Sequence, residues 1–359
     1  MNYREIGSDF ELDLKILNNS NNNFLNKENS KKNMLFLSSG REALKYILKL
    51  DINISDEILL PAYLCKSVLK PVKELNIEFQ FYTVNKDLSI NFEDLRNKIT
   101  ENTTHILVVN YFGKQHNLKK LKDLTNDKVM ILEDITHTFF NKNIKDNSAD
   151  YQFASLRKWF SIPDGGLIQT NNKLDIKLDK NPYNEFTFKN LLASILKKSY
   201  LDDQFNKKDY YLKVYEEASK FYDNKKITPA SITNISREIL NKYDFELLRN
   251  RRTNNYDFLY SIIKNDFKKH INPLTQKLDK SETPLGLPII CNRRDDLRKY
   301  LINNDIYPPI HWNLPNEILV EEFKLSHEVS NNILTIPCDH RYEIKDMRRI
   351  IKVLNKFYK

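Results

Sequence analysis

The feature that most constrains this fold is the alternation of short apolar runs and amphipathic segments between Met34 and Thr170. The apolar runs have the length of strands, and the segments between them carry apolar residues at helical spacing, as from Arg41 to Leu50. Such alternation is typical of an α/β domain with a largely parallel sheet. We expect strands at residues 34–37, 57–60, 78–84, 105–110, 129–132, 149–155 and 166–170, and helices at residues 41–50, 66–75, 92–99 and 118–125.

The pattern changes on either side of this region and predicts three parts. Residues 1–33 are polar and include an asparagine-rich run, so we expect an irregular or mobile N-terminal arm. Residues 34–245 form the expected large α/β domain, which includes polar helical residues 186–222 of no evident chemistry. Residues 246–359 supply a linking helix and a small C-terminal α+β domain. Its expected elements are one or two helices within 235–263, strands at 287–291 and 333–336, and helices at 294–303 and 344–358.

Composition excludes several classes of protein. The chain of 359 residues has no apolar run long enough for a membrane span, and its three cysteines form neither a disulfide framework nor a metal-binding spacing. The net charge of +9 comes from lysines dispersed among acidic residues, without the clustered basic and aromatic residues of a nucleic-acid site. We therefore expect a soluble, cytoplasmic protein with no metal, membrane contact or nucleic-acid partner, whose charge weakly favours an anionic substrate.

Two candidate ligand-binding features follow strands of the expected sheet. Ligands of open α/β sheets bind outside the carboxyl ends of the strands. Ser38-Ser39-Gly40 stands between a strand and a helix, where backbone amides can bind a phosphate, although an ordinary capped helix start gives the same pattern. Asp134 follows an apolar run, and its carboxylate could hold a cationic nitrogen with His137 within reach. A structural salt bridge is the alternative for Asp134.

Two further features carry an amine and an imidazole. Lys158 lies between apolar residues, with Ser155 before it and Gly165-Gly166 after it. Desolvation lowers the pKa of a lysine, and the neutral amine can form a Schiff base. An exposed lysine beside a hairpin turn is the simpler interpretation of the same stretch. His311 stands in a proline-rich turn, where it faces either a cleft or the packed interior.

Taken in order, these features match a known family. Phosphate donors, a carboxylate for a pyridine nitrogen and a Schiff-base lysine are the groups that pyridoxal phosphate requires. The chain resembles the DegT/DnrJ/EryC1/StrS aminotransferases, the sugar aminotransferases of pyridoxal-phosphate fold type I. The matching motifs are Leu37-Ser38-Ser39-Gly40-Arg41-Glu42-Ala43-Leu44, Leu59-Leu60-Pro61-Ala62-Tyr63, Leu88 to Leu95, Asn110-Tyr111-Phe112-Gly113, Glu133-Asp134-Ile135-Thr136-His137, and Lys158 followed by Gly165-Gly166, with weaker matches at Arg251-Arg252, His311 and Ile336-Pro337.

The resemblance implies a role for each motif. Lys158 would form the Schiff base and then move protons between the substrate and the cofactor. Asp134 would keep the pyridine nitrogen protonated, and His137 would bind the phenolic oxygen of the ring. The groups expected to hold the phosphate are Ser39, Gly40, Arg41 and Ser155.

The chain departs from the family's pattern at three places. Ser155 precedes the lysine by three residues, whereas the family places its serine five residues before. Cys65 stands where the family often has an aromatic that stacks on the cofactor, so Tyr63 or another group must cover the ring. We expect Tyr63 and His311 to contact the substrate. The family's Asn-Tyr-Arg motif, whose asparagine reaches the partner subunit's phosphate, is not evident, and the candidates to replace it are Asn234 and Asn184.

The resemblance implies an aminotransferase that moves an amino group from an amino acid, with glutamate expected, to a keto-sugar linked to a nucleotide. Such an enzyme would serve the synthesis of surface polysaccharides or related glycans, as a homodimer with shared active sites. One alternative is an enzyme of the same fold that acts on a non-sugar carbonyl or carries out an elimination. The family's dehydratases replace the lysine with histidine, which Lys158 argues against. A second alternative is a non-catalytic binding or regulatory protein that keeps the fold.

Overall fold

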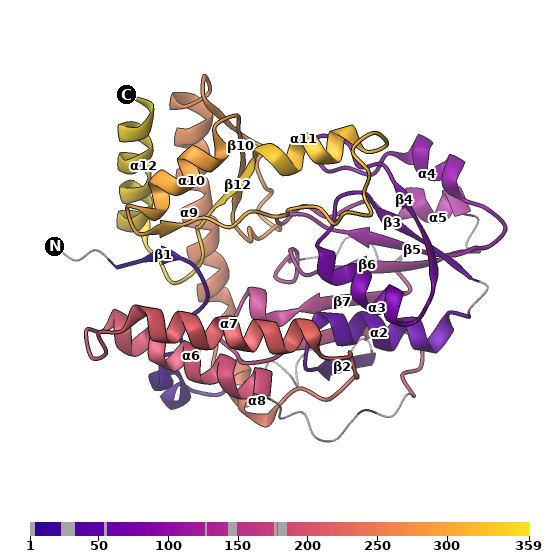
Figure 1. Cartoon of the computed structure of the whole chain (residues 1–359), viewed down its shortest axis with the longest axis horizontal. Helices are drawn as coiled ribbons and strands as arrows, with labels where there is room; N and C mark the ends of the chain where they lie inside the picture. Colours follow the sequence, from indigo (N-terminus) through magenta and orange to yellow (C-terminus); the bar gives the residue numbers. More distant parts are fainter. Residues whose placement is uncertain are drawn as a thin grey trace.

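The computed structural model describes residues 4–22, 33–53, 56–125, 128–142, 149–175, 178 and 185–359. Figure 1 shows a large sheet on one side of the molecule and a group of C-terminal helices on the other, with two long helices beneath. Within the ranges given above, no helix is both long enough and apolar enough to cross a membrane.

A seven-stranded sheet forms the centre of the larger part. Its strands are β2 (Asn33–Leu37), β3 (Glu57–Pro61), β4 (Glu78–Tyr82), β5 (Thr103–Val109), β6 (Met130–Asp134), β7 (Tyr151–Ser155) and β8 (Gly166–Thr170). They lie in the order β2-β8-β7-β6-β5-β3-β4. Strand β8 is antiparallel to both of its neighbours, and the other pairs are parallel. The largely parallel α/β sheet predicted from the sequence is confirmed.

Amphipathic helices connect these strands, because a parallel sheet buries both faces and needs a crossover between successive strands. Helix α2 (Gly40–Asp51) begins where the Ser39 hydroxyl accepts a hydrogen bond from the Glu42 amide, and it packs against β7 and β8. The expected helix at 66–75 starts as a 3-10 turn, Lys66–Val68, before α3 (Leu69–Glu74). The crossovers are completed by α4 (Phe92–Lys98) and α5 (Lys119–Thr125).

Two long helices, α6 (Glu185–Leu201) and α7 (Lys208–Asn224), lie side by side (Figure 1). The helical stretch expected at 235–263 is two helices, α8 (Asn234–Asn241) and α9 (Phe245–Asp266). The break between them is a capping site, since Asp244 accepts a hydrogen bond from the amide of Leu247.

A second core lies in the C-terminal part, which is the α+β arrangement predicted from the sequence. Its antiparallel sheet has the order β12-β10-β9, and helices α9, α10 and α12 contribute buried residues to the same core. The elements are β9 (Ile271–Pro273), β10 (Leu287–Cys291), α10 (Arg294–Ile302), β11 (Ile306–Tyr307), α11 (Lys324–Asn332), β12 (Ile333–Ile336) and α12 (Ile344–Tyr358). Strands β9 and β11 and helix α11 were not predicted.

The N-terminal segment is packed, in contrast to the mobile arm that its polar composition predicted. Strand β1 (Ile6–Gly7) pairs in parallel with β11, and Ile6 is fully buried in the C-terminal core. Arg341 donates hydrogen bonds to the carbonyl oxygens of Ser8 and Asp9. Since these bonds use backbone atoms and one distant arginine, composition could not reveal them. The end of the expected arm, residues 23–32, lies outside the described residues.

Candidate active site

The carboxyl ends of β2, β5, β6 and β7 meet at one edge of the sheet, because these strands run in the same direction. A cavity of about 180 Å³ opens there, and we call it the edge cavity. Its walls include residues at the ends of β5, β6 and β7, the first turns of α2 after β2, and residues from distant segments. They are Gly40, Arg41, Leu44, Cys65, Ser67, Val68, Val109, Asn110, Asp134, Thr136, His137, Phe153, Ser155, Arg157, Lys158, Tyr222 and Trp312. The edge cavity therefore brings together most of the site residues predicted from the sequence.

Lys158 lies in the connection between β7 and β8, within a 3-10 turn that spans Leu156–Lys158. Its side chain is exposed and lines both the edge cavity and a larger cavity beside it. The simpler interpretation of this stretch is correct in its geometry, because β7 and β8 are antiparallel and pair Ser155 with Gly166. The exposed face of Lys158 is turned toward the interior of the two cavities.

Gly166 allows strand β8, at the end of the Lys158 loop, to pack closely against the start of α2. A Cβ atom at this position would lie 2.2 Å from the carbonyl oxygen of Ser39, so only glycine allows β8 to approach the start of α2 so closely. Asp164, just before it, is buried and accepts hydrogen bonds from the amide and the hydroxyl of Thr233. The Gly-Gly turn therefore holds the lysine loop against α2 and against the segment that precedes α8.

Asp134 ends β6 with its carboxylate on the edge cavity. The amide of Thr136 donates a hydrogen bond of 2.9 Å to Asp134 Oδ1. Burial raises the pKa of Asp134 to about 6, despite the hydrogen bonds from Thr136. A carboxylate destabilised in this way favours a cationic partner, which a protonated ring nitrogen would supply.

His137 lies beside Asp134 on the same wall with a defined tautomer. Its Nδ1 accepts a hydrogen bond of 3.3 Å from the amide of Phe112. Burial holds the pKa of His137 well below its usual value, so the ring is neutral and its hydrogen resides on Nε2. The ring of Trp312 stacks on it with centroids 5.2 Å apart. His137 Nε2 is therefore a hydrogen-bond donor, as a phenolic oxygen requires.

Gly40 and Ser155 form the opposite end of the edge cavity. A Cβ atom on Gly40 would lie 3.1 Å from the Cβ of Ser155 and 3.3 Å from its nitrogen, so the first turn of α2 rests directly on the end of β7. The amide of Ser155 itself donates to the hydroxyl of Thr136. Ser39 is buried and caps α2, and it is not among the residues of the cavity wall. Glycine at position 40 therefore allows the helix start to approach Ser155 closely at the wall of the edge cavity.

Two arginines reach the wall that the two cavities share. Arg41 lies over the ring of Tyr222 at 4.4 Å and pairs with Asp223 at 2.8 Å. Arg157 lies over the ring of Phe186 at 4.7 Å, and this ring stacks on Tyr222. Sequence reasoning found Arg41 but missed Arg157 and Tyr222, although the position of Arg157 next to Lys158 was a usable signal.

The larger cavity, about 780 Å³ in volume, extends from Lys158 toward the C-terminal part. His311 lies on its wall, and its Nδ1 is 2.9 Å from the hydroxyl of Thr335. Burial and, second, the charge of Lys158 lower the pKa of His311 to about 3, so this ring is neutral. More cationic than acidic side chains line the large cavity. The cationic ones are Arg41, Lys66, Arg157, Lys158, Arg252, Arg298 and Arg341, and the acidic ones are Asp9, Asp223 and Asp339.

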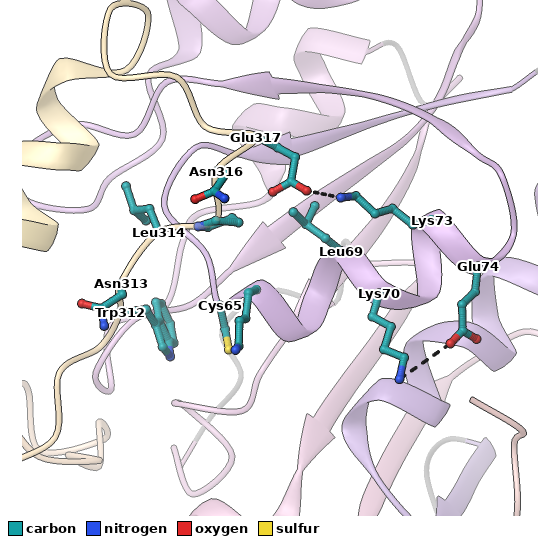
Figure 2. Close-up of a pocket in the computed structure, with 12 residues that line it drawn as sticks. Cys65, Leu69, Lys70, Lys73, Glu74, Trp312, Asn313, Leu314, Asn316 and Glu317 are labelled. Atoms are coloured by element: carbon teal, nitrogen blue, oxygen red, sulfur yellow. Dashed lines mark hydrogen bonds and ion pairs between the residues drawn. The ribbon is translucent and has the colours of Figure 1, made fainter. Parts of the chain in front are cut away.

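A third cavity, of about 750 Å³, lies on the other side of Cys65 and Trp312 (Figure 2). Both side chains also line the edge cavity, so they separate the two spaces. Trp312 comes from the segment after His311 and supplies an aromatic ring to the wall that Cys65 leaves without one. Sequence reasoning named Cys65 as a departure but did not find Trp312.

Two predicted residues lie away from these walls. Tyr63 is fully buried in the core of the sheet, and its hydroxyl donates a hydrogen bond to the carbonyl oxygen of His311. It therefore supports the His311 segment and is not on the wall of any of the three cavities. Asn234 is exposed at the start of α8 and does not line them either, while Asn184 lies outside the described residues.

Comparisons with known proteins agree with this geometry. A model of the DegT/DnrJ/EryC1/StrS aminotransferase family matches residues 22–177. A GDP-4-keto-6-deoxy-D-mannose 3-dehydratase of Yersinia pseudotuberculosis is 30% identical over 94 residues, which are 26% of this chain and 24% of that enzyme. The chain thus matches about a quarter of the length of this relative.

Solved structures match over nearly the whole chain. PseC of Helicobacter pylori, an aminotransferase involved in the biosynthesis of pseudoaminic acid, has a TM-score of 0.69 at 16% identity, with coverage of 98% of this chain and 99% of that one. NtdA of Bacillus subtilis, solved with bound cofactor PMP, has a TM-score of 0.67 at 17% identity, with coverage of 97% and 78%. The shared architecture is that of the fold type I enzymes. Residues 22–177, which carry the predicted motifs, therefore match the DegT/DnrJ/EryC1/StrS aminotransferase family, and the chain as a whole shares the fold of the solved sugar aminotransferases.

Proposed function

We propose that this protein is a pyridoxal-phosphate-dependent aminotransferase. The observation that carries the proposal is the convergence of Lys158, Asp134 and His137 on one cavity, opposite Gly40 and Ser155. When bound, pyridoxal phosphate supplies a carbonyl for an amine and a ring that accepts electrons from the substrate carbon. The groups that this cofactor needs line the edge cavity, and the absence of a Cβ on Gly40 lets the start of α2 lie against Ser155 at its wall.

Each side chain has a defined task. Lys158 Nζ would hold the cofactor and carry the proton that leaves and returns to the substrate carbon. Asp134 would hold a proton on the ring nitrogen, and His137 Nε2 would donate a hydrogen bond to the phenolic oxygen. Gly40, at the start of α2, and Ser155 would hold the phosphate, with the guanidinium groups of Arg41 and Arg157 on the adjoining wall.

The amino acceptor is a keto-sugar linked to a nucleotide, and glutamate is the amino donor. The excess of cationic side chains on the wall of the large cavity supports an anionic substrate. The product serves surface polysaccharide or related glycan synthesis in the cytoplasm. The functional unit is a homodimer, in which Asn234 would reach the cofactor phosphate of the neighbouring subunit.

An elimination reaction is the second candidate, because the curated relative is a 3-dehydratase. Lys158 favours amino transfer, since the family's dehydratases carry histidine at this position. Incubation of the loaded protein with glutamate and a nucleotide-linked keto-sugar, followed by mass spectrometry, separates the two reactions. Amino transfer replaces the carbonyl oxygen of the sugar by an amino group from glutamate, whereas dehydration removes water.

The test of the cofactor assignment is spectroscopic. We expect protein loaded with pyridoxal phosphate to be yellow, and we expect Lys158→Ala to lose this absorbance. Lys66→Ala is the matched control, because Lys66 also lines the large cavity but has no task in the chemistry. A wild-type protein that stays colourless after reconstitution would refute the proposed function.

Addition of single amino acids to the loaded protein then identifies the donor. Loss of the yellow absorbance with glutamate, and its recovery with the keto-sugar nucleotide, is the expected result. 2-Oxoglutarate restores the absorbance by reversing the glutamate half-reaction, so only recovery with another keto acid, and not with the sugar nucleotide, would replace the sugar in this proposal by a non-sugar carbonyl.

A further inference from the structure

Arg252 is a buried cation on the wall of the large cavity, in the first half of helix α9. Its side chain is 1% exposed. The charge belongs to none of the tasks assigned above, and burying a guanidinium group costs free energy unless hydrogen bonds and an opposite charge compensate it. The surroundings of Arg252 therefore have to show what compensates this charge.

One edge of the guanidinium group is anchored. Its Nη1 donates hydrogen bonds of 3.3 Å and 3.1 Å to the carbonyl oxygens of Pro284 and Leu285. Its Cζ lies 4.5 Å from the ring centroid of Trp159. Trp159 follows Lys158 in the chain, and its indole nitrogen donates to the carbonyl oxygen of Thr136 at 2.6 Å. Through its contact with Trp159, Arg252 is thus held next to the loop that carries Lys158.

The other edge of the group has no partner. Nε and Nη2 are both buried, and neither makes a hydrogen bond within the part of the chain that the structure describes. The N–H bonds of these two atoms are parallel in a planar guanidinium group, and this is the edge that binds a carboxylate through two hydrogen bonds. Two unsatisfied buried donors are unfavourable, and the arrival of an anion would satisfy both.

The nearby acid does not fill this role. Asp339 lies close enough to Arg252 to interact with it through space. However, both carboxylate oxygens of Asp339 accept hydrogen bonds from Arg341, each at 2.9 Å. Burial lowers the pKa of Arg252 to about 10, so the group is still charged at neutral pH. The Arg252 guanidinium group next to the Lys158 loop is thus charged and held in place, and its Nε and Nη2 donors are free to bind an anion.

We propose that Arg252 binds a carboxylate of the amino-acid donor, through Nε and Nη2. The assignment rests on the proposed function and names the residue that recognises one substrate class in it. A carboxylate has two oxygens in one plane, which matches the two donors of this edge. A diphosphate presents more oxygens and more charge, which suits the several cations on the rest of the cavity wall.

The first experiment measures donor affinity in single-turnover half-reactions of loaded protein. Arg252→Met is expected to raise the dissociation constant of glutamate about 100-fold, the size of the loss when one partner of a buried charge pair is removed. Two analogues report which carboxylate is bound: 4-aminobutyrate lacks the α-carboxylate, and norvaline lacks the side-chain carboxylate. The analogue without the carboxylate in question should bind wild type and Arg252→Met equally.

The control variant is Arg251→Met, on the same helix but exposed, which should leave all these constants within threefold of wild type. Arg252→Lys keeps the charge but not the fork, and it should restore only part of the affinity. Equal losses with glutamate and both analogues would show a merely structural role. A loss confined to the nucleotide-sugar would move the site to phosphate. Either result overturns the assignment.

A second experiment needs neither activity nor cofactor. The chain has two tryptophans, so Trp312→Phe leaves Trp159, under the Arg252 guanidinium, as the only indole fluorophore. We expect glutarate to change this fluorescence with a saturable dependence on concentration, and we expect inorganic phosphate at the same ionic strength to leave it unchanged. No response to glutarate, or an equal response to phosphate, would overturn the assignment. If the wild type stays colourless with pyridoxal phosphate, the proposed function fails first and this inference fails with it.

Discussion

Asp134→Asn tests how the edge cavity holds its ligand. Burial raises the pKa of Asp134 from 3.8 to about 6 in the folded protein. Because the unfolded chain ionises at the lower pH, the folded cofactor-free protein loses stability as pH rises through this window. Above pH 6 the loss is complete. The carboxylate is therefore kept at a cost to the cofactor-free protein.

The size of the effect follows from the two pKa values. Between about pH 4.5 and 7.5, the ionisation of Asp134 lowers the unfolding free energy of the wild type by about 2 kcal/mol. Asparagine does not titrate, so the variant has no such loss. We therefore expect cofactor-free Asp134→Asn to gain about 2 kcal/mol in unfolding free energy relative to wild type between these two pH values. The asparagine side chain retains an oxygen that can accept the hydrogen bond from the amide of Thr136, so packing changes little.

Urea denaturation of both proteins at several pH values measures this difference. Loaded protein should show the opposite order, because a protonated ring nitrogen compensates the wild-type carboxylate, and the neutral amide of the variant cannot hold that proton. The variant should therefore bind pyridoxal phosphate more weakly and be more stable without it. Parallel pH profiles for the two cofactor-free proteins would refute the reasoning, since Asp134 would then ionise as an ordinary exposed acid.

Two further substitutions test other parts of the structure. Gly40→Ala should weaken pyridoxal-phosphate binding about tenfold at a cost of about 1 kcal/mol in stability, because the added Cβ meets Ser155 at 3.1–3.4 Å. An absorbance titration measures the affinity, and unchanged binding would place the phosphate elsewhere. Arg341→Met should lower the unfolding free energy by about 3–5 kcal/mol, because Glu11 and Asp339 would each lose a buried partner. Urea denaturation checks this result against Arg348→Met, whose exposed side chain should change stability by less than about 0.5 kcal/mol; equal effects would contradict it.

The sequence predicted the parts of the site that follow strands. Asp134 ends β6, Ser155 ends β7 and Gly40 begins the helix after β2. Strand periodicity is a local signal, and parallel pairing then brings these ends to one edge without further information. The Lys158 loop was predicted for the same reason, because the Gly165-Gly166 turn that shapes it lies within ten residues of the lysine. The parts of the candidate site that depend on local sequence pattern and on parallel strand pairing could therefore be predicted from the sequence.

The residues that were missed come from segments with no local pattern for a ligand. Tyr222 and Phe186 lie on α7 and α6, where they look like ordinary aromatic residues of a polar helix pair. Arg252 on α9 was found only as part of a weak family match at Arg251-Arg252, and its role was not predicted, because its unpaired edge depends on where Pro284 and Leu285 place their carbonyl oxygens. These contacts are tertiary, and a single sequence contains no periodicity that reports them. The packed N-terminal segment escaped prediction for the same reason.

Tyr63 shows how the loss of an aromatic residue at position 65 is compensated by an aromatic residue elsewhere in the chain. The family's aromatic position holds Cys65, so sequence reasoning transferred the aromatic task to the nearest candidate, Tyr63. The fold instead buries Tyr63 and uses its hydroxyl to hold the carbonyl oxygen of His311. This bond positions the next residue, Trp312, against the ring of His137.

A bulky side chain at position 65 would compete with Trp312 for the wall that the two residues now share. The small thiol of Cys65 therefore leaves space on this wall for the indole of Trp312, which the hydrogen bond of Tyr63 helps to position. The stacking of Trp312 also excludes water from one face of His137, which supports the low pKa that keeps this imidazole neutral. Cys65, the departure from the family's aromatic position, thus leaves space for Trp312, and the stacking of Trp312 helps to keep His137 neutral.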